Sequence, residues 1–299
     1  EEAGGAAEPG ELLRQRLAHP ERCMLLLSFG FFLSVTALAM HDDRVPVFSF
    51  GSNSCQQLRG RLEDPSLEVV PAVLRGWTRV FSAHSQGWGG GCATLVPEPE
   101  AHVLGSVAML SRDQAEVLDT FEGVPHIYRR HTGVRAELHR GEGREPEEME
   151  VMFYRKVHLE DEKPSTSYLQ AVFWNERSNF PDNTAPIQVR GALGADYGVW
   201  SPPPPRSMDL RCFLTRLSLE LPQPWVMPHD MQRKAATLEA AGVGSAAALA
   251  AALEGAGDAR LPADVLSEGE QELARRILSQ PGAPAAAGAT SAAAADGQA

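Results

Sequence analysis

The sequence has few cysteines, and their spacing excludes a common kind of cysteine-dependent domain. Four occur in 299 residues, at Cys23, Cys55, Cys92 and Cys212, and they form no Cys-x-x-Cys pair and have no histidine at zinc-finger spacing. Cys23 lies in a separate apolar run, and the three that remain are an odd number, which disfavours a disulfide framework. This pattern favours a reducing compartment, so we expect a cytoplasmic protein.

Basic residues and two catalytic signatures are also scarce or missing. The chain carries 27 Lys and Arg against 39 Asp and Glu, for a net charge of −12. Binding to nucleic acid without sequence preference needs a basic surface, so no nucleic-acid partner is predicted. The sequence contains no His-x-x-x-His pair for a helical metal site and no Gly-x-Ser-x-Gly elbow of a serine hydrolase.

Long apolar runs are limited to residues 23–40, which contain no charged side chain. At eighteen residues the run is at the short end for a membrane span. Ala37-Leu38-Ala39 supplies an A-x-A sequence of the kind that signal peptidases cleave. Because Met40 stands just before the first predicted strand, residues 1–39 could also be an extension outside the functional protein. The sequence leaves a secretory signal, a membrane anchor and a dispensable extension open, and membrane contact is expected only through this run.

The apolar fraction of 43% and the charged fraction of 22% are ordinary for a globular protein, and local patterns divide the chain into five parts. We predict a disordered segment (1–22), the apolar run (23–40), a folded domain (44–200), a linker with a helical extension (201–280) and a disordered tail (281–299). The linker contains the rigid run Pro202–Pro205. Residues 210–221 fit a helix or a strand, and residues 231–253 and 268–279 are predicted helices.

The folded domain reads as a mixture of strands and helices. Strands are predicted over 45–50, 93–96, 102–110, 128–139 and 149–157, and residues 69–83 fit one strand or two around Gly76. Helices are predicted over 56–62, 111–121 and 164–174. A glycine loop separates two of the strands at 87–91. The helix over 111–121 has the clearest signals, because Ser111 and Gln114 form a capping-box pattern and Gly123 follows its end.

Two short runs carry the residue types that acid–base chemistry on an amide requires. In Phe50-Gly51-Ser52-Asn53 an apolar strand breaks into a turn whose glycine could adopt positive φ, so that successive backbone N–H groups converge on an anion. Glu122 stands at the end of the predicted helix, where its charge meets the negative end of the helix dipole. Taken alone, the first run is typical of an ordinary turn and the second of a solvated helix end.

The order of several such runs resembles the gamma-glutamylcyclotransferase-like superfamily. That family opens with a strand leading into Tyr-Gly-Ser-Asn and carries its catalytic glutamate in a Leu-Asp-x-x-Glu-Gly run. The matching segments here are 50–53, Leu118 to Val124, the pair Tyr128-Arg129, a strand around Tyr154, and Pro164-Ser165-Thr166-Ser167-Tyr168-Leu169. The likeness covers residues 45–175, slightly under half of the chain. Phe50 replaces the family's tyrosine, so any hydrogen bond made by that hydroxyl is missing.

The resemblance implies both a fold and a reaction. The fold is α+β, a small mixed β-barrel flanked by helices, here with a helical C-terminal extension. The reaction cleaves a gamma-glutamyl amide without water, because the substrate's own α-amino group attacks its γ-carbonyl to give 5-oxoproline and a free amine or amino acid. The implied partner is a small gamma-glutamyl substrate, and no metal or other cofactor is needed.

The resemblance also assigns roles to individual residues. Glu122 is the general acid and base, and the expected substrate-binding residues are Phe50, Gly51, Ser52, Asn53, Tyr128 and Tyr168. The alternative is a catalytically silent binding module with the same fold. The two differ in whether Glu122 and the 51–53 turn line a common pocket. The leaving group, whether from glutathione, a gamma-glutamyl amino acid or an amine, and the oligomeric state are left open.

Overall fold

The computed structural model describes residues 44–141, 143–221, 228–256 and 260–280. The predicted disordered segments 1–22 and 281–299 and the apolar run 23–40 lie outside these residues, so their assignments stay predictions. The described residues belong to one compact unit, Asp42–Ala299. Within the described ranges, no helix combines the length and apolar character needed to cross a membrane.

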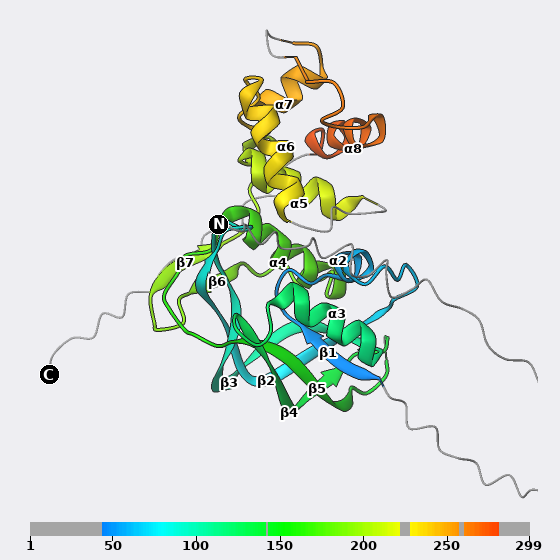
Figure 1. The fold of residues 1–299 in the computed structure, drawn as a ribbon, viewed down its shortest axis with the longest axis vertical. Coiled ribbons are helices and arrows are strands. Elements are labelled where there is room, and N and C mark those ends of the chain that lie inside the picture. Colours follow the sequence, from blue (N-terminus) through cyan, green and yellow to red (C-terminus); the bar gives the residue numbers. More distant parts are fainter. Residues whose placement is uncertain (1–43, 142, 222–227, 257–259, 281–299) are drawn as a thin grey trace, which may run out of the picture. The chain divides into compact units, whose positions relative to one another are not determined.

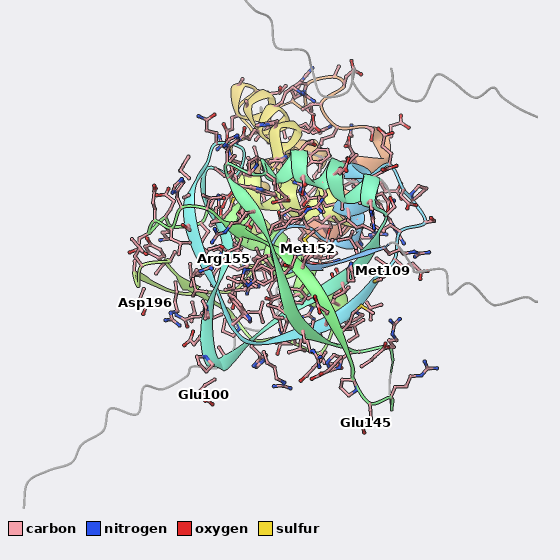
Figure 2. The ribbon with its side chains drawn as sticks, turned by 60° about the horizontal axis from the view of Figure 1, so that its bottom comes forward. Glu100, Met109, Glu145, Met152, Arg155 and Asp196 are labelled. Atoms are coloured by element: carbon pink, nitrogen blue, oxygen red, sulfur yellow. The ribbon has the colours of Figure 1, made fainter. Side chains whose placement is uncertain are left out.

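The centre of the fold is a closed β-barrel with strand order β1-β3-β2-β4-β5. β1 pairs antiparallel with β3 and parallel with β5, which makes the barrel mixed as predicted. Figure 2 labels Met109 on β3 and Met152 on β5, the two strands that border β1. The strands are β1 (Val45–Ser49), β2 (Val69–Ser85), β3 (Gly90–Leu110), β4 (Tyr128–Leu138) and β5 (Glu147–Lys156).

The β2–β3 hairpin is longer and more continuous than predicted. One strand spans Gly90–Leu110, where the sequence suggested two strands, and Gly90 and Gly91 open this strand instead of belonging to a loop. The pairing shifts register between Arg75 and Trp77, around Gly76, whose φ is +77°. Such an irregularity lets a long hairpin bend around a barrel without ending, which explains why the expected break did not divide it.

Three helices flank the barrel (Figure 1): α2 (Cys55–Arg61), α3 (Arg112–Glu122) and α4 (Thr166–Asn179). In α3 the predicted capping box of Ser111 and Gln114 is present, and Gly123 ends the helix in the left-handed region. The prediction that a helix starts at Pro164 was wrong by two residues. The Ser165 hydroxyl accepts the N–H of Tyr168 and caps the helix, which therefore begins at Thr166.

The remaining elements are short strands and a group of helices. The undecided segment 210–221 is a helix, and the single helix expected over 231–253 is two. Gly242, with φ of +83°, follows the first, and the Ser245 side chain caps the second. The predicted domain boundary near residue 200 stays a prediction. The elements are β6 (Ile187–Arg190), β7 (Asp196–Trp200), the 3₁₀-helix η1 (Pro205–Ser207), α5 (Leu210–Glu220), α6 (Pro228–Ala240), α7 (Ala246–Leu253) and α8 (Glu268–Leu278).

Candidate active site

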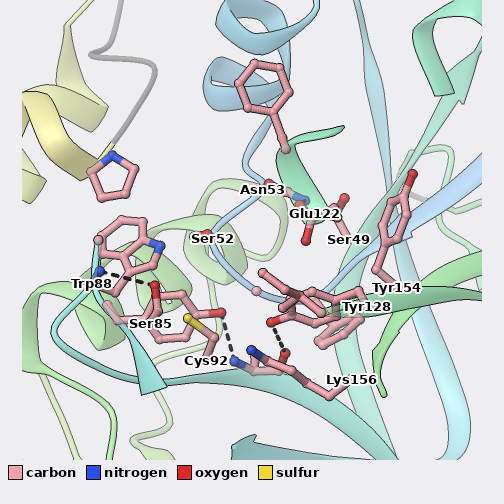
Figure 3. A pocket seen from close by; sticks show the side chains of 18 of the residues that line it. Ser49, Ser52, Asn53, Ser85, Trp88, Cys92, Glu122, Tyr128, Tyr154 and Lys156 are labelled. Atoms are coloured by element: carbon pink, nitrogen blue, oxygen red, sulfur yellow. Dashed lines mark hydrogen bonds between the residues drawn. The ribbon is translucent and has the colours of Figure 1, made fainter. Parts of the chain in front are cut away.

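A cavity of about 540 Å³ opens where the end of β1, the end of α3 and the β2–β3 turn meet. Figure 3 shows side chains from these elements around it. Every residue that the sequence singled out for the site lines this cavity: Phe50, Gly51, Ser52, Asn53, Glu122, Tyr128 and Tyr168. The turn and the helix-end carboxylate, some seventy residues apart in sequence, therefore share one pocket.

The 50–53 loop is held in place through its carbonyl groups. Arg79 donates to the Phe50 carbonyl at 3.1 Å, and Asn175 donates to the Gly51 carbonyl at 3.0 Å. Gly51 is not in the left-handed region, contrary to our expectation. Its lack of a side chain has another cause, since a Cβ there would lie 3.0 Å from the Tyr168 hydroxyl. Glycine at this position permits close approach of α4 to the loop.

The backbone N–H groups of the same loop are uncommitted. Within the described ranges, the amides of Gly51, Ser52 and Asn53 donate no hydrogen bond, although the next amide, of Ser54, donates to the Ser52 carbonyl at 2.7 Å. Backbone donors without a partner beside a cavity are suited to bind an anion or a developing oxyanion. The loop therefore has free backbone donors beside the cavity without the positive φ expected of its glycine, and its role in binding substrate stays a prediction.

Glu122, the last residue of α3, is oriented by two partners. Its Oε1 accepts from Asn53 Nδ2 at 3.0 Å and from Arg61 Nη1 at 3.1 Å, and Arg61 Nη1 also donates to Asn53 Oδ1 at 2.7 Å. The Glu122 side chain is 13% exposed, and its Oε2 has no hydrogen-bond partner among the described residues. One carboxylate oxygen is thus anchored while the other is left for a ligand in the cavity.

Arg61 is a site residue that the sequence did not reveal. Its side chain is 7% exposed, and its guanidinium carbon lies 5.2 Å from the centre of the Phe121 ring. Arg59 lies in the same last turn of α2 but donates to the Leu67 carbonyl instead. The available signal was a basic residue near the end of a short helix after the turn. Sequence alone did not tell which of the two arginines returns to the loop.

The two predicted tyrosines bracket a single backbone unit of β3. Tyr128 donates its hydroxyl proton to the Ala93 carbonyl at 3.1 Å, and the Tyr168 hydroxyl accepts the Ala93 N–H at 2.9 Å. Burial raises the pKa of both phenols well above the ordinary value, so both stay neutral near pH 7. They offer the cavity uncharged hydroxyl groups. A third, Tyr154, donates to Asp119 at 2.8 Å and links β5 to α3.

The deep part of the cavity contains two further residues that the sequence did not indicate. Lys156 is 5% exposed and Cys92 is 7% exposed, and both line the pocket. Burial raises the pKa of the Cys92 thiol to about 11, so it is protonated at neutral pH and is not a thiolate nucleophile. The pocket mouth is lined by side chains that reach solvent: His84, Gln86, Ile127 and His229.

Comparison with known proteins gives a family match for the barrel region. Residues 47–171 match the family described as "Gamma-glutamyl cyclotransferase, AIG2-like". No curated protein matches the chain.

Several solved structures share part of the fold. One titled "Gamma-glutamyl cyclotransferase" is 24% identical, with a TM-score of 0.40, covering 46% of this chain and 80% of that one. An uncharacterized protein from Homo sapiens is 25% identical, with a TM-score of 0.41 and coverages of 47% and 83%. A yeast gamma-glutamyl cyclotransferase, described as specific to glutathione, is 15% identical, with a TM-score of 0.29 and coverages of 43% and 77%.

The family match spans β1 to the first turn and a half of α4, and these elements supply all the lining residues of the cavity except Pro228 and His229. The closed mixed barrel with flanking helices is the fold that the sequence predicted from the same segment. The match over residues 47–171 therefore supports the resemblance to the gamma-glutamylcyclotransferase-like superfamily.

Proposed function

We propose that the protein cleaves a gamma-glutamyl amide by intramolecular aminolysis, releasing 5-oxoproline and a free amine or amino acid. The observation that carries this proposal is that Glu122 and the 51–53 loop line one cavity. This was the arrangement that separates an enzyme from a docking module, because a single small molecule can then reach the carboxylate and the free backbone donors together.

The reaction uses a nucleophile that the substrate already contains. The Glu122 carboxylate takes one proton from the α-ammonium group, and the resulting amine attacks the γ-carbonyl carbon to form the five-membered ring. The carbonyl oxygen becomes an oxyanion, which the N–H groups of residues 51–53 stabilise. The bond to the leaving nitrogen then breaks as Glu122 returns its proton there, and the second proton from the α-nitrogen passes to the released amine.

The geometry of the site suits this modest chemistry. Because the nucleophile is tethered, the protein has only to hold the folded substrate conformer and move one proton. Asn53 and Arg61 fix the carboxylate through Oε1, which leaves Oε2 as the proton acceptor. Burial keeps the phenols of Tyr128 and Tyr168 neutral, so they contact substrate without competing for its protons.

The test is release of 5-oxoproline from glutathione, gamma-glutamyl amino acids and gamma-glutamyl amines by the full chain. Glu122→Gln should lower kcat by about a hundredfold or more, since general acid–base catalysis is worth roughly that factor. Glu116→Gln, at an exposed position of the same helix, is the matched control and should keep wild-type activity. Wild-type turnover by Glu122→Gln would contradict the proposal.

The binding-module alternative is supported by Phe50, which lacks the hydroxyl of the family's usual tyrosine. Its ring is 6% exposed and packs edge-on against Phe153, with ring centres 5.9 Å apart. The same assay separates the alternatives, because a silent module would bind gamma-glutamyl compounds in calorimetry but release no 5-oxoproline from any of them.

A further inference from the structure

Lys156 places a cation in the deep part of the cavity without a charged partner. It is the last residue of β5 and is 5% exposed, and its backbone N–H donates to Thr94 Oγ1 at 3.0 Å. Its Nζ lies 4.5 Å from the centre of the Tyr128 ring. Within the part of the chain that the structure describes, the ammonium group forms no ion pair and donates no hydrogen bond.

The acidic groups around Lys156 are bonded to other residues, uncharged near pH 7, or exposed to solvent. Glu122 is anchored by Asn53 and Arg61. The Cys92 thiol, whose pKa burial raises to about 11, is uncharged near pH 7. The charge of Glu160 also acts on the lysine, but that residue is exposed to solvent. The ring of Tyr128 offsets only part of the cost of burying an ammonium group, because a cation–π contact is weaker than the hydration that the ammonium loses.

A buried, unpaired cation that lines a cavity is a binding site for an anion. Among the described residues, the ammonium group of Lys156 contacts the ring of Tyr128 and donates no hydrogen bond. The cavity therefore has two charged poles of opposite sign, Lys156 and the free oxygen of Glu122. In Figure 3 Tyr128 is drawn between them.

We infer that Lys156 binds the α-carboxylate of the gamma-glutamyl group, and this inference rests on the proposed function. The α-carbon of that group carries an ammonium and a carboxylate. When the ammonium group lies against Glu122, the carboxylate on the same carbon lies toward Lys156, which carries the opposite charge. The three N–H groups of residues 51–53 are then left for the γ-carbonyl oxygen, so the loop stabilises the oxyanion and the lysine recognises the amino acid.

This division of roles makes Lys156 a specificity residue. A substrate without the α-carboxylate would leave the buried ammonium unpaired and should be rejected, because a lost hydrogen bond to a charged group costs about 1.5–3 kcal/mol. The site is thereby selective for gamma-glutamyl groups over 4-aminobutanoyl groups, which carry the same nucleophile and the same amide.

The experiment compares two substrates that share one leaving amine, a gamma-glutamyl amide and the corresponding 4-aminobutanoyl amide, which cyclises to 2-pyrrolidinone. The wild type should prefer the gamma-glutamyl amide in kcat/KM. Lys156→Met should reduce that preference by about 10- to 100-fold, the range of one charge-assisted hydrogen bond, mainly by raising KM for the carboxylate-bearing substrate. Lys156→Arg should recover part of the preference, and Lys163→Met, at a nearby exposed position, should leave it unchanged.

Direct binding keeps this inference separate from the proposed function. Calorimetry with 5-oxoproline and 2-pyrrolidinone on the wild type, Lys156→Met and Lys156→Gln requires no turnover. If the wild type cyclises gamma-glutamyl amides and the variants keep its full preference, the role of Lys156 is overturned and the reaction stands. If no substrate is turned over but 5-oxoproline binding depends on Lys156, the reaction is overturned and the anion site stands. Equal binding of both ligands by wild type and variants overturns the anion site.

Discussion

Arg61 joins two parts of the candidate site, Asn53 and Glu122, that are 69 residues apart in the sequence. Its Nη1 contacts both Glu122 and Asn53, at 3.1 and 2.7 Å, so one guanidinium fixes the carboxylate relative to the loop. Hydrogen bonds to charged groups are stronger than neutral ones, and a partly buried carboxylate without its partner is costly. Under the proposed function, the arginine acts through Glu122 and is a positioning residue.

Replacing Arg61 with methionine should lower kcat by about 10- to 100-fold and change KM less, because the lost charge-assisted bond is worth about 1.5–3 kcal/mol. Adding Arg61→Met to Glu122→Gln should cost little more than Glu122→Gln alone, since the arginine acts through that carboxylate. The measurement is steady-state kinetics on both single variants and the double variant.

Arg59→Met is the control for the arginine prediction, because Arg59 lies in the same helical turn and donates to the Leu67 carbonyl at 2.7 Å. Its kcat should stay at the wild-type value. Additive losses in the double variant, or an Arg61→Met variant with normal kcat, would show that the arginine does not position Glu122.

We also expect Lys156 to lower the stability of the unliganded protein at neutral pH. Burial lowers its pKa below the ordinary value. The buried charge therefore lowers the stability of the folded state. This loss of stability is complete at pH values below the folded pKa, and it disappears at pH values above the unfolded pKa of about 10.4. Lys156→Met removes this penalty, so the variant should be more stable than wild type at neutral pH. Its advantage should shrink as pH rises through that window.

Chemical denaturation of wild type and Lys156→Met at several pH values between 7 and 10.5 tests this. The difference between the two proteins cancels the titration of groups that they share, including the buried tyrosines, whose pKa values are raised. A variant that is less stable than wild type at pH 7 would mean that the ammonium has a stabilising partner in the folded state.

At the scale of elements, close packing of β3 against the segment before α4 explains two glycines. A Cβ at Gly91 would lie 2.3 Å from the Glu162 carbonyl oxygen, and one at Gly90 would lie 2.7 Å from the Ser165 backbone nitrogen. Both obstacles are backbone atoms, which cannot rotate away. The contact fixes the position of Ser165, which caps α4. Because the Ser165 side chain accepts the backbone N–H of Tyr168, the contact also fixes the position of Tyr168 in the cavity.

Gly91→Ala should therefore lower the free energy of unfolding by about 1–3 kcal/mol, the usual cost of overpacking. Gly269→Ala is the matched control, because that glycine is in α8 and a Cβ there would meet no atom within 4 Å. It should raise stability by up to about 1 kcal/mol through helix propensity. Guanidinium denaturation of both variants decides this, and a Gly91→Ala variant as stable as wild type would show that the two segments are not in rigid contact.

The same elements show what could be predicted from sequence. The ends of α3 could be predicted from local sequence signals, because Ser111, Gln114 and Gly123 act within their own turn. The barrel, and the seven residues that were predicted for the site and line one cavity, followed from the order of short runs along the chain, while the roles of these residues stay predictions. The continuity of β3, the role of Gly51 and the partners of Glu122 depend on atoms from distant segments. Arg61 and Lys156 could not be singled out from the sequence, because their importance lies in burial and in which groups surround them.

At the scale of the molecule, the C-terminal helices share side-chain contacts with the barrel region and have a core of their own. That core is formed by buried apolar side chains of α5 to α8, including Phe213, Leu249 and Ile277. Thr166 at the start of α4 donates to Asp209, the cap of α5, at 2.5 Å. Pro228 and His229, at the start of α6, line the cavity itself. The helical extension is thus part of the pocket wall.

α6 also holds the β2–β3 turn, through Gln232. Its Nε2 donates to the carbonyls of Gln86 and Gly87 at 2.8 and 2.7 Å. Gly87 packs so closely against the helix that a Cβ there would lie 2.9 Å from Pro228 Cγ. The turn carries Trp88, whose ring centre is 5.2 Å from that of Tyr168 in the cavity. Motion of the turn would therefore reach the substrate pocket.

Gln232→Ala should loosen this turn and raise KM for gamma-glutamyl substrates by about 3- to 10-fold, since a typical hydrogen bond contributes about 1 kcal/mol. Binding of 5-oxoproline should change less, because the product lacks the leaving group and is smaller than the substrate. Gln271→Ala is the control, because its side-chain amide also donates to a backbone carbonyl, that of Leu266, but lies in α8 away from the cavity.

Amide hydrogen exchange at residues 85–90 should become faster in Gln232→Ala and should stay unchanged in the control. Unchanged exchange and unchanged KM in that variant would mean that the helical extension borders the pocket without shaping it.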